Sequence, residues 1–473
     1  MLGSWFLAVV ESESHAHSVP GWVTILFAMI LVLMVACLAL EEKLHAKKSI
    51  IVGSFAGVRL LLATLLDLLT FGQVRLPTGH EMDLPIYIPA IDWGVITIIL
   101  GASLFVEVTS RSGIFTWMAI KLTKKSGGDP WLLLLAYGIL TVLFSAVLNN
   151  VTAMIIIGSL TTVSLNKLNR NDLLKGFLLT EGLLTNVGGL LTLISSVPNI
   201  IVGKAAGISF VKFFMVAAPF VVIATIVTLF MSKWKFRISG LTSDQQRSES
   251  RKLVEGFDEN ESVASSRFFW FSVVVLVLFI FCLAGQSALP WGLDQLGMGF
   301  IALLFSGVVL LAYRHEVDKF YAAVDWDLLA FFAALFVTIH VMEHALVLDK
   351  MGAGIASVLQ LQSQVASGVL LGCSALASSV TDNIPLAAVL AQILGKMGTA
   401  SDSSFWWCVI FGANLGGNIT PIGSASTLVA MTIIHRQKIP LTFTGFVLIA
   451  SPFALVQIIL AIGYTLVFGP LLF

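Results

Sequence analysis

The sequence predicts an all-α polytopic membrane protein built from two inverted repeats, with about ten transmembrane helices, two re-entrant hairpins and two broken helices. Of its 473 residues, 57% are hydrophobic and only 11% are charged, whereas soluble domains average about 25% charged residues. Long apolar segments approach the roughly 20 residues that a membrane-spanning helix needs. The polar motifs that interrupt these segments recur in the same order in the two halves of the chain.

This composition excludes a soluble enzyme and a disordered protein. The 27 basic and 27 acidic residues balance, so there is no basic field for nucleic acid. The four cysteines lie in apolar stretches without CxxC spacing, which indicates neither zinc nor a disulfide. We therefore expect the lipid bilayer as the surroundings, and a bacterial inner (plasma) membrane as the simplest localisation.

The basic residues indicate which loops are cytoplasmic, because cytoplasmic loops carry the excess of Lys and Arg. They predict a cytoplasmic linker and external termini. The predicted domains are an N-terminal tail (1–20), a first repeat half (21–237), the linker (238–266) and a second, inverted half (267–473). The ten predicted full spans are 21–41, 49–70, 92–110, 174–203, 211–232, 267–287, 294–313, 324–344, 404–434 and 441–470.

Two further apolar segments, 131–165 and 364–398, are predicted to be hairpins. Only Asn149, Asn150 and Thr152 interrupt the first of them, too few polar residues for a hydrated outer loop. We interpret it as a re-entrant hairpin whose polar tip lines a protein cavity inside the membrane. Two closely packed full spans are the alternative.

The internal repeat is visible at three landmarks. Asp92-Trp93 matches Asp325-Trp326, and Asn149-Asn150 matches Asp382-Asn383, each 233 positions later. Asn186, in the predicted broken helix 174–203, matches its counterpart in 404–434 at a distance of 228. The basic loops give the two copies opposite orientations. Inverted repeats with helices interrupted near the midplane are typical of secondary transporters.

The broken helices are predicted from small residues and proline. Gly188, Gly189 and Pro198 disfavour a continuous first helix, and Gly416 and Pro421 disfavour the second. A break frees backbone carbonyls that coordinate Na+ and exposes helix N-termini that face anions. The alternative is that these small residues only let helices pack closely.

Three carboxylates are candidates for proton coupling: Asp382, Glu181 and Glu107. Asp382, the only carboxylate at the polar landmarks, could bind Na+ when ionised and a proton when neutral. Alternatively it is a protonated residue that only hydrogen-bonds a neighbour. Glu181 is a proton carrier or a snorkelling end residue. Glu107 either pairs with Arg111 on one helix face or ends its span, before an interfacial helix at 114–125.

Two further pairs of charged residues receive structural interpretations. Arg59 and Asp67, outside the repeated unit, are predicted to pair with each other. Asp92 and Asp325 begin their helices and are predicted to cap them.

These motifs resemble those of the ArsB/NhaD group of the ion transporter superfamily, which includes P-protein and NhaD-like permeases. More distantly the sequence is similar to divalent-anion/sodium symporters. The motifs that carry the resemblance, over residues 25–470, are IDW, VEVTSRSGIF, SAVLNNVTAM, LTNVGGLLTLISSVPNIIVG, VDWDLLAFFAALFV, SSVTDNIPLAAV and GANLGGNITPIGSAST.

The resemblance implies a scaffold domain, a transport domain, elevator-type movement and a homodimer. It implies no cofactor beyond Na+ and/or H+ as coupling ion. A Na+ site would be formed by Asn149, Asn150, Asp382 and Asn383 with backbone carbonyls near Gly188 and Gly416. The ion and substrate sites carried over by motif are Asn149, Asn150, Thr152, Asn186, Ser195, Ser196, Asn199, Asp382, Asn383, Asn414, Thr420, Ser424 and Ser426.

Two departures keep a second function open. The relatives usually have Asp where this chain has Asn149, and a GDPPN-like motif where it reads Ser195-Ser196-Val197-Pro198-Asn199. Na+/H+ antiport by an elevator mechanism is the first hypothesis. The alternative is a Na+- or H+-coupled permease for a small anion or oxyacid, such as arsenite or a carboxylate. An intramembrane enzyme is disfavoured because no catalytic motif lies at membrane depth, so no catalytic residue is predicted.

Overall fold

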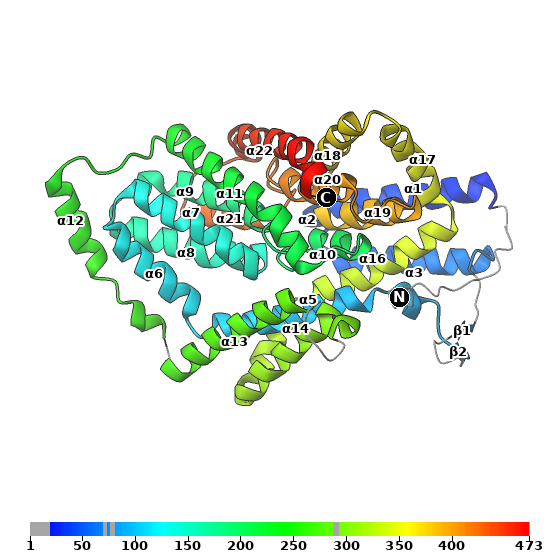
Figure 1. Ribbon diagram of the computed structural model, residues 1–473, viewed down its shortest axis with the longest axis horizontal. Helices are drawn as coiled ribbons and strands as arrows, with labels where there is room; N and C mark the ends of the chain where they lie inside the picture. Colours follow the sequence, from blue (N-terminus) through cyan, green and yellow to red (C-terminus); the bar gives the residue numbers. More distant parts are fainter. Residues whose placement is uncertain (1–18, 70–72, 76–80, 264, 287–292, 473) are drawn as a thin grey trace. The chain divides into compact units, whose positions relative to one another are not determined.

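The computed structural model describes residues 19–69, 73–75, 81–263, 265–286 and 293–472, and most of them are helical (Figure 1). The predicted tail therefore lies almost wholly outside the described residues. The elements before the linker are α1 (Gly21–Ala39), α2 (Glu41–Leu44), α3 (Lys48–Leu65), β1 (Gln73–Arg75), β2 (Glu81–Asp83), α4 (Tyr87–Ala90), α5 (Trp93–Ser110), α6 (Ile114–Ser126), α7 (Pro130–Val147), α8 (Asn150–Lys167), η1 (Asn171–Leu173), α9 (Leu174–Gly188), α10 (Val197–Ala205) and α11 (Phe210–Lys235).

The linker holds a helix that the sequence analysis did not predict, α12. The remaining elements are α12 (Asp244–Glu255), η2 (Glu259–Ser262), α13 (Ser266–Gly285), α14 (Leu293–Ala312), η3 (Arg314–Glu316), α15 (Val317–Ala323), α16 (Trp326–His344), α17 (Val347–Leu359), α18 (Ser363–Val380), α19 (Asn383–Lys396), α20 (Ser404–Gly416), α21 (Ala425–Arg436) and α22 (Phe443–Leu472). The two short strands pair antiparallel, with Val74 opposite Met82.

The predicted polytopic membrane fold is confirmed. In the described part of the chain, nine helices are long and apolar enough to cross a membrane, or ten if one bent pair counts as a single span. That pair, Leu296–Ala312 with Arg314–Ala323, bends by 92°. Within α14, Gly297 has φ 75° and ψ 169°, a conformation that glycine adopts without steric cost.

The two hairpins form at the predicted places. In the first, α7 and α8 are joined at Leu148-Asn149, and in the second, α18 and α19 are joined at Thr381-Asp382. Asn149 accepts a hydrogen bond from the Thr152 amide, and Asp382 accepts one from the Ile384 amide, so each begins its outgoing helix as an N-cap. The arms α7 and α18 have 18 residues each, about 27 Å of helix. That length also places both among the candidate spans.

Both broken helices are also present. In the first repeat α9 ends at Gly188 and α10 resumes at Val197, and in the second α20 ends at Gly416 and α21 resumes at Ala425. The residues after the first segments, Gly189 and Gly417, share the same backbone angles, φ −59° and ψ −15°. The two breaks are therefore built alike.

Matching hydrogen bonds tie each break to its own hairpin. The Ser145 hydroxyl donates to the Thr185 carbonyl at 2.6 Å, and Ser378 donates to the Ala413 carbonyl at 2.6 Å. In the same way, a threonine of each break donates to a carbonyl of the hairpin's incoming arm. These bonds are Thr192 to Ala146 at 2.6 Å and Thr420 to Ser379 at 2.5 Å. Because the contacts keep the sequence offsets of 233 and 228, the repeat extends to three-dimensional structure.

By contacts the chain forms two compact units, which cut across the repeat halves. The first combines the described residues up to Ile96 with Asp325–Ile355, and the second comprises Thr97–Val324 and Ala356–Phe473. The hairpins and broken helices all belong to the second unit. In the first unit, Asp92 accepts from the Val95 amide and Asp325 from the Leu328 amide, so both predicted caps are confirmed.

The predicted pair of Arg59 and Asp67 is wrong. Arg59 on α3 is fully buried and donates to the Thr338 hydroxyl of α16 and to the Met34 sulfur of α1, both at 3.2 Å. Asp67 follows the end of α3 in an exposed position with φ 50°. Arg59 lies on the buried face of α3, whereas Asp67, eight residues later, lies beyond the end of that helix.

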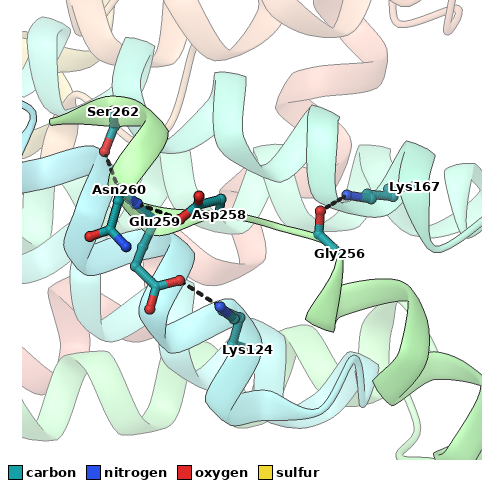
Figure 2. A network of polar contacts seen from close by, with 7 residues as sticks. All are labelled: Lys124, Lys167, Gly256, Asp258, Glu259, Asn260 and Ser262. Atoms are coloured by element: carbon teal, nitrogen blue, oxygen red, sulfur yellow. Dashed lines mark hydrogen bonds and ion pairs between the residues drawn. The ribbon is translucent and has the colours of Figure 1, made fainter. Parts of the chain in front are cut away.

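The linker lies against the end of the first hairpin and of α6 that the basic residues predict to be cytoplasmic (Figure 2). Lys124 of α6 pairs with Glu259 of η2 at 2.6 Å, and Lys167 of α8 donates to the Gly256 carbonyl at 2.8 Å. Asp129, which caps α7, also accepts from the Leu241 amide at 2.7 Å. We refer to residues 238–263, held by these three contacts, as the cytoplasmic strap.

The Lys124–Glu259 pair predicts how the strap responds to pH. The hydrogen bond from Lys124 holds the pKa of the Glu259 carboxyl below its usual value. The contact is therefore fully present above the ordinary carboxyl pKa of about 4.3 and is lost as the pH falls through the lowered value. We expect the protease sensitivity of the strap to rise below about pH 4 in wild type. Glu259→Gln should show the higher sensitivity already at neutral pH, and an identical pH profile in both would contradict the assignment.

Candidate functional site

The centre of the second unit is a network of buried amide and hydroxyl side chains. Asn186, near the end of α9, is fully buried. Its amide nitrogen donates to the Asn418 side-chain oxygen at 2.8 Å. Its own side-chain oxygen accepts from Ser424 at 2.8 Å and from Ser426 at 3.3 Å. One residue of the first broken helix thus contacts three residues of the second broken helix.

The equivalent Asn–Ser hydrogen bond also forms in the opposite direction, from the first broken helix to the second. Asn414, which corresponds to Asn186, accepts from the Ser196 hydroxyl at 2.8 Å, and Ser196 corresponds to Ser424. Asn414 also donates to the Asn199 side-chain oxygen at 2.9 Å. Ser196 and Ser424 directly precede α10 and α21. The two breaks therefore exchange an Asn–Ser hydrogen bond in each direction, as two copies related by a local two-fold axis would.

The tip of the first hairpin joins this network through Asn150. Its amide nitrogen donates to the Asn186 oxygen at 3.3 Å, and its oxygen accepts from Ser145 at 2.6 Å. Gly189 lies against the same amide, since a Cβ atom there would come within 2.8 Å of the Asn150 oxygen. The backbone carbonyl of Gly189 accepts from Ser195 at 2.6 Å and from Asn199 at 2.7 Å.

Sequence analysis missed one arm of the network. Asn418 donates to the Gln457 side chain of α22 at 2.8 Å, and Gln457 donates to the Thr228 hydroxyl of α11 at 2.9 Å. Asn418 corresponds to Leu190 in the first repeat, so the repeat pattern does not mark it. Gln457 was detectable, because it is the one amide in a 30-residue helix that is otherwise apolar or hydroxylic.

The structure brings together some of the predicted site residues and leaves others apart. Those in the central network are Asn150, Asn186, Ser196, Asn199, Asn414, Ser424 and Ser426. Ser195 binds backbone carbonyls within its own break, and Thr420 binds the second hairpin. At the hairpin tips, Asn149, Thr152, Asp382 and Asn383 are exposed or half-buried. The Na+ site proposed at the tips stays a prediction.

The other two candidate carboxylates have different surroundings. Glu107 pairs with Arg111 at 2.8 Å, and about a third of its side chain is exposed, as the i,i+4 spacing predicted. The separate helix α6 follows at Ile114. Glu181 is fully buried and accepts a 2.5 Å hydrogen bond from Thr161. Neither belongs to the central network.

The side chains and helix ends of the central network determine which ions it can bind. Its side chains are neutral amides and hydroxyls, and two helices begin at its edge. Among the first three residues of α10 only Val197 has an amide that the helix leaves unused, because Pro198 has no N–H and the Asn199 amide donates to the Ser196 carbonyl. The first amides of α21 are unused by the helix. Helix N-termini stabilise negative charge, and oxygens of unwound backbone coordinate hard cations. Such a centre can hold a small anion, a cation or both without a fixed charge of its own.

This fold and this centre define a secondary-transporter type of membrane protein. Comparison with known proteins places it further: the chain belongs to the CitMHS family, described as citrate transporters, whose model matches residues 38–410. The family match covers both hairpins, the first break and the beginning of α20. Membership of the ion transporter superfamily agrees with the resemblance found in the motifs.

Individual relatives agree with this placement. An uncharacterized transporter of Mycobacterium tuberculosis is 28% identical over 379 residues, 79% of this chain and 86% of that protein. The P protein of Sus scrofa is 23% identical over 525 residues, 95% of this chain but 60% of its own length. Among solved structures, the Alcanivorax borkumensis YdaH transporter has a TM-score of 0.57 at 14% identity and covers 94% of this chain and 98% of its own. Neisseria gonorrhoeae MtrF has a TM-score of 0.56 at 13% identity, with 94% of each chain covered. At these identities the two structures show a shared fold.

Proposed function

We propose that this protein is a cation-coupled secondary carrier of a small carboxylate or oxyanion, the second of the two hypotheses drawn from the sequence. The observation that carries the proposal is the meeting of two helix N-termini at a centre of neutral amides and hydroxyls. Ser196 and Ser424 stand at those termini, each bound to an asparagine of the other repeat. The name of the family, citrate transporter, supports a carboxylate as the transported species.

Electrostatics favour an anion over a bare cation at this centre. A cation antiporter needs an acidic ligand to exchange Na+ for a proton, and the central side chains provide none. A carboxylate anion, in contrast, would gain hydrogen bonds from the Val197 amide of α10, from the first amides of α21 and from the serine hydroxyls. Na+ or H+ entering with it would offset the charge that crosses the membrane. Movement would follow the alternating-access, elevator-type scheme of inverted repeats, in a homodimer.

Na+/H+ antiport remains the second candidate function, because one observation favours it. Asp382 caps α19 at the tip of the second hairpin and is half-buried, so its carboxylate can meet both an ion and the solvent. The motif-level resemblance to the ArsB/NhaD group supports the same function.

One experiment separates the two functions. Purified protein in proteoliposomes is given a Na+ or proton gradient, and uptake of labelled citrate and of arsenite is followed beside an internal pH dye. The proposal predicts anion uptake that stops when the gradient is collapsed. Antiport predicts Na+-driven proton movement in buffer without any carried anion, and its loss in Asp382→Asn. Correctly inserted protein that shows neither response would contradict both.

A further inference from the structure

The Glu181 carboxyl is a lone acidic group in the interior of the second unit. It lies on α9 with none of its surface exposed. One oxygen accepts from the Thr161 hydroxyl of α8 at 2.5 Å, and the other has no hydrogen-bond partner within the described residues. An unpaired carboxylate in such surroundings costs several kcal/mol, so the protonated form is the stable one.

Its neighbours supply no compensating positive charge. The titratable group that faces it from α7 is Tyr137, and α20 and α22 carry no charged residue. On η1, Asp172 pairs with Arg170 at 3.0 Å. On α9 itself, Lys175 is six residues away, about 9 Å along the axis.

Among the basic residues of the other packed helices, Lys235 of α11 and Arg436 of α21 are exposed, and Lys212 lies 20 residues before the Ser232 of α11 that contacts α9. The remaining three have partners elsewhere. Lys167 of α8 lies 3.9 Å from the centre of the Phe257 ring, and Lys233 of α11 lies 4.4 Å from that of Trp131. His435 of α21 makes a 2.6 Å hydrogen bond with the Leu441 carbonyl. Glu181 therefore has a hydroxyl and no ion as its partner.

A row of buried hydroxyls leads from this carboxyl toward the end of α6. Ser164 stands one turn after Thr161 on the same face of α8. The Ser164 hydroxyl is 2.7 Å from the Tyr137 hydroxyl, which is 2.6 Å from the Thr123 hydroxyl. All four side chains are fully buried. Thr123 lies in the last turn of α6, beside Lys124, where the cytoplasmic strap is attached.

We propose that Glu181 binds the coupling proton and exchanges it with the cytoplasm along Thr161, Ser164, Tyr137 and Thr123. The inference rests on the proposed cation-coupled carrier and names the proton as the coupling ion. Each hydroxyl accepts a proton on its oxygen and passes its own to the next, so only the carboxyl changes charge. Thr161 and Ser164 form no direct hydrogen bond, so the proposed route requires a bridging water at that step.

The position of Glu181 explains how its charge would reach the transport site. It precedes Asn186 by five residues, about 7.5 Å along the same helix. Next to it, Gly182 packs against Ala430 of α21, where a Cβ atom would come within 2.8 Å. Loss of the proton would place a negative charge on the first broken helix, at its contact with α8, close to the centre that holds the anion in the proposed function.

The test reads the proton site directly, whether or not any substrate is transported. Infrared difference spectra of wild-type protein in membranes should contain the carbonyl band of a protonated carboxyl, and Glu181→Gln should lack it. The same variant should keep exchange of labelled citrate across the membrane but lose its dependence on a proton gradient. If wild type carries no citrate, the proposed function fails, while the infrared band still decides the proton site.

The relay is tested by hydrogen–deuterium exchange of that band. We expect Tyr137→Phe, and independently Ser164→Ala, to slow its shift in D2O by about tenfold or more. Thr141→Val is the matched control, because Thr141 lies one turn along α7 and its hydroxyl binds only the Tyr137 carbonyl. Absence of a Glu181-dependent band would overturn the proton site. Unchanged exchange in both relay variants would overturn the route.

Discussion

Replacing Asn186 with leucine is expected to lower gradient-driven uptake by about a hundredfold, the largest effect in the chain. The side chain holds one partner through its nitrogen and three through its oxygen. Leucine leaves the Asn418 side-chain oxygen without its donor and removes the Asn186 oxygen from Ser424, which keeps only its 3.0 Å contact with Ser426. Each unsatisfied group costs about 1–3 kcal/mol, and about 3 kcal/mol corresponds to a hundredfold.

The measurement is the initial uptake rate per correctly folded molecule in proteoliposomes. Thr180→Val is the control, since Thr180 is buried on the same helix but binds Ser232 and lies outside the network. It should lower stability while the uptake rate stays close to that of wild type. If Asn186→Leu behaves like this control, the network has a structural role and the transport site lies elsewhere.

The two equivalent Asn–Ser hydrogen bonds between the broken helices allow a second, more specific test. Double-mutant cycles on Asn186 with Ser424, and on Asn414 with Ser196, should give coupling energies of the same sign in the range of about 0.5–3 kcal/mol. The two pairs have equal distances, 2.8 Å each. Coupling in one pair and none in the other would contradict an equal share of the two repeats in the site.

The second large effect is expected for Gly416→Ala, on stability. A Cβ atom at this position would lie 2.2 Å from the Ala375 carbonyl oxygen of α18, which is backbone and cannot rotate away. The end of α20 would have to move off the hairpin. Overpacking of a tight contact costs about 1–3 kcal/mol, and a backbone clash lies at the upper end. We expect a clearly lower melting temperature in detergent.

Gly372→Ala is the matched control, because it lies on α18 and a Cβ atom there meets nothing within 4 Å. It should melt like wild type. Gly188→Ala, the equivalent change in the first repeat, should be destabilised in the same direction, since its Cβ would lie 2.7 Å from the Val142 backbone. Equal melting of Gly416→Ala and Gly372→Ala would show that the two helices are not in close contact.

The sequence predicted the fold well because its signals are local. Hairpins and breaks are marked by Asn149, Asp382 and paired glycines, and their positions agree with the structure within a few residues. The residues whose hydrogen bonds hold each broken helix to its hairpin are even separated by the same sequence offsets as the repeats. The length of an apolar segment and the residues that break a helix determine structure within one or two helical turns. They can therefore be recognised in a single sequence.

The site was less predictable, since its partners are hundreds of residues apart. Asn186 and Asn414 could be named from the repeat, but their reciprocal serine contacts depend on how the two breaks meet in space. The prediction for Arg59 failed for the same reason: its partner, Thr338, is on a helix 279 residues later. Asn418 is the clearest omission, because the other repeat has a leucine in its place.

In the proposed carrier, the cytoplasmic strap would make the two end states of the transport cycle unequal. In carriers built from inverted repeats, one end state turns into the other when the repeats exchange conformations, so identical repeats would give equal energies. Here the positions that correspond to Lys124 and Asp129, 233 residues later, are Ser357 and Gln362, which carry no charge. Each 1.4 kcal/mol of difference changes the ratio of the two states about tenfold. One ion pair and two hydrogen bonds between charged side chains and the backbone, all on one repeat, would thus be enough to decide toward which side of the membrane the proposed carrier rests open.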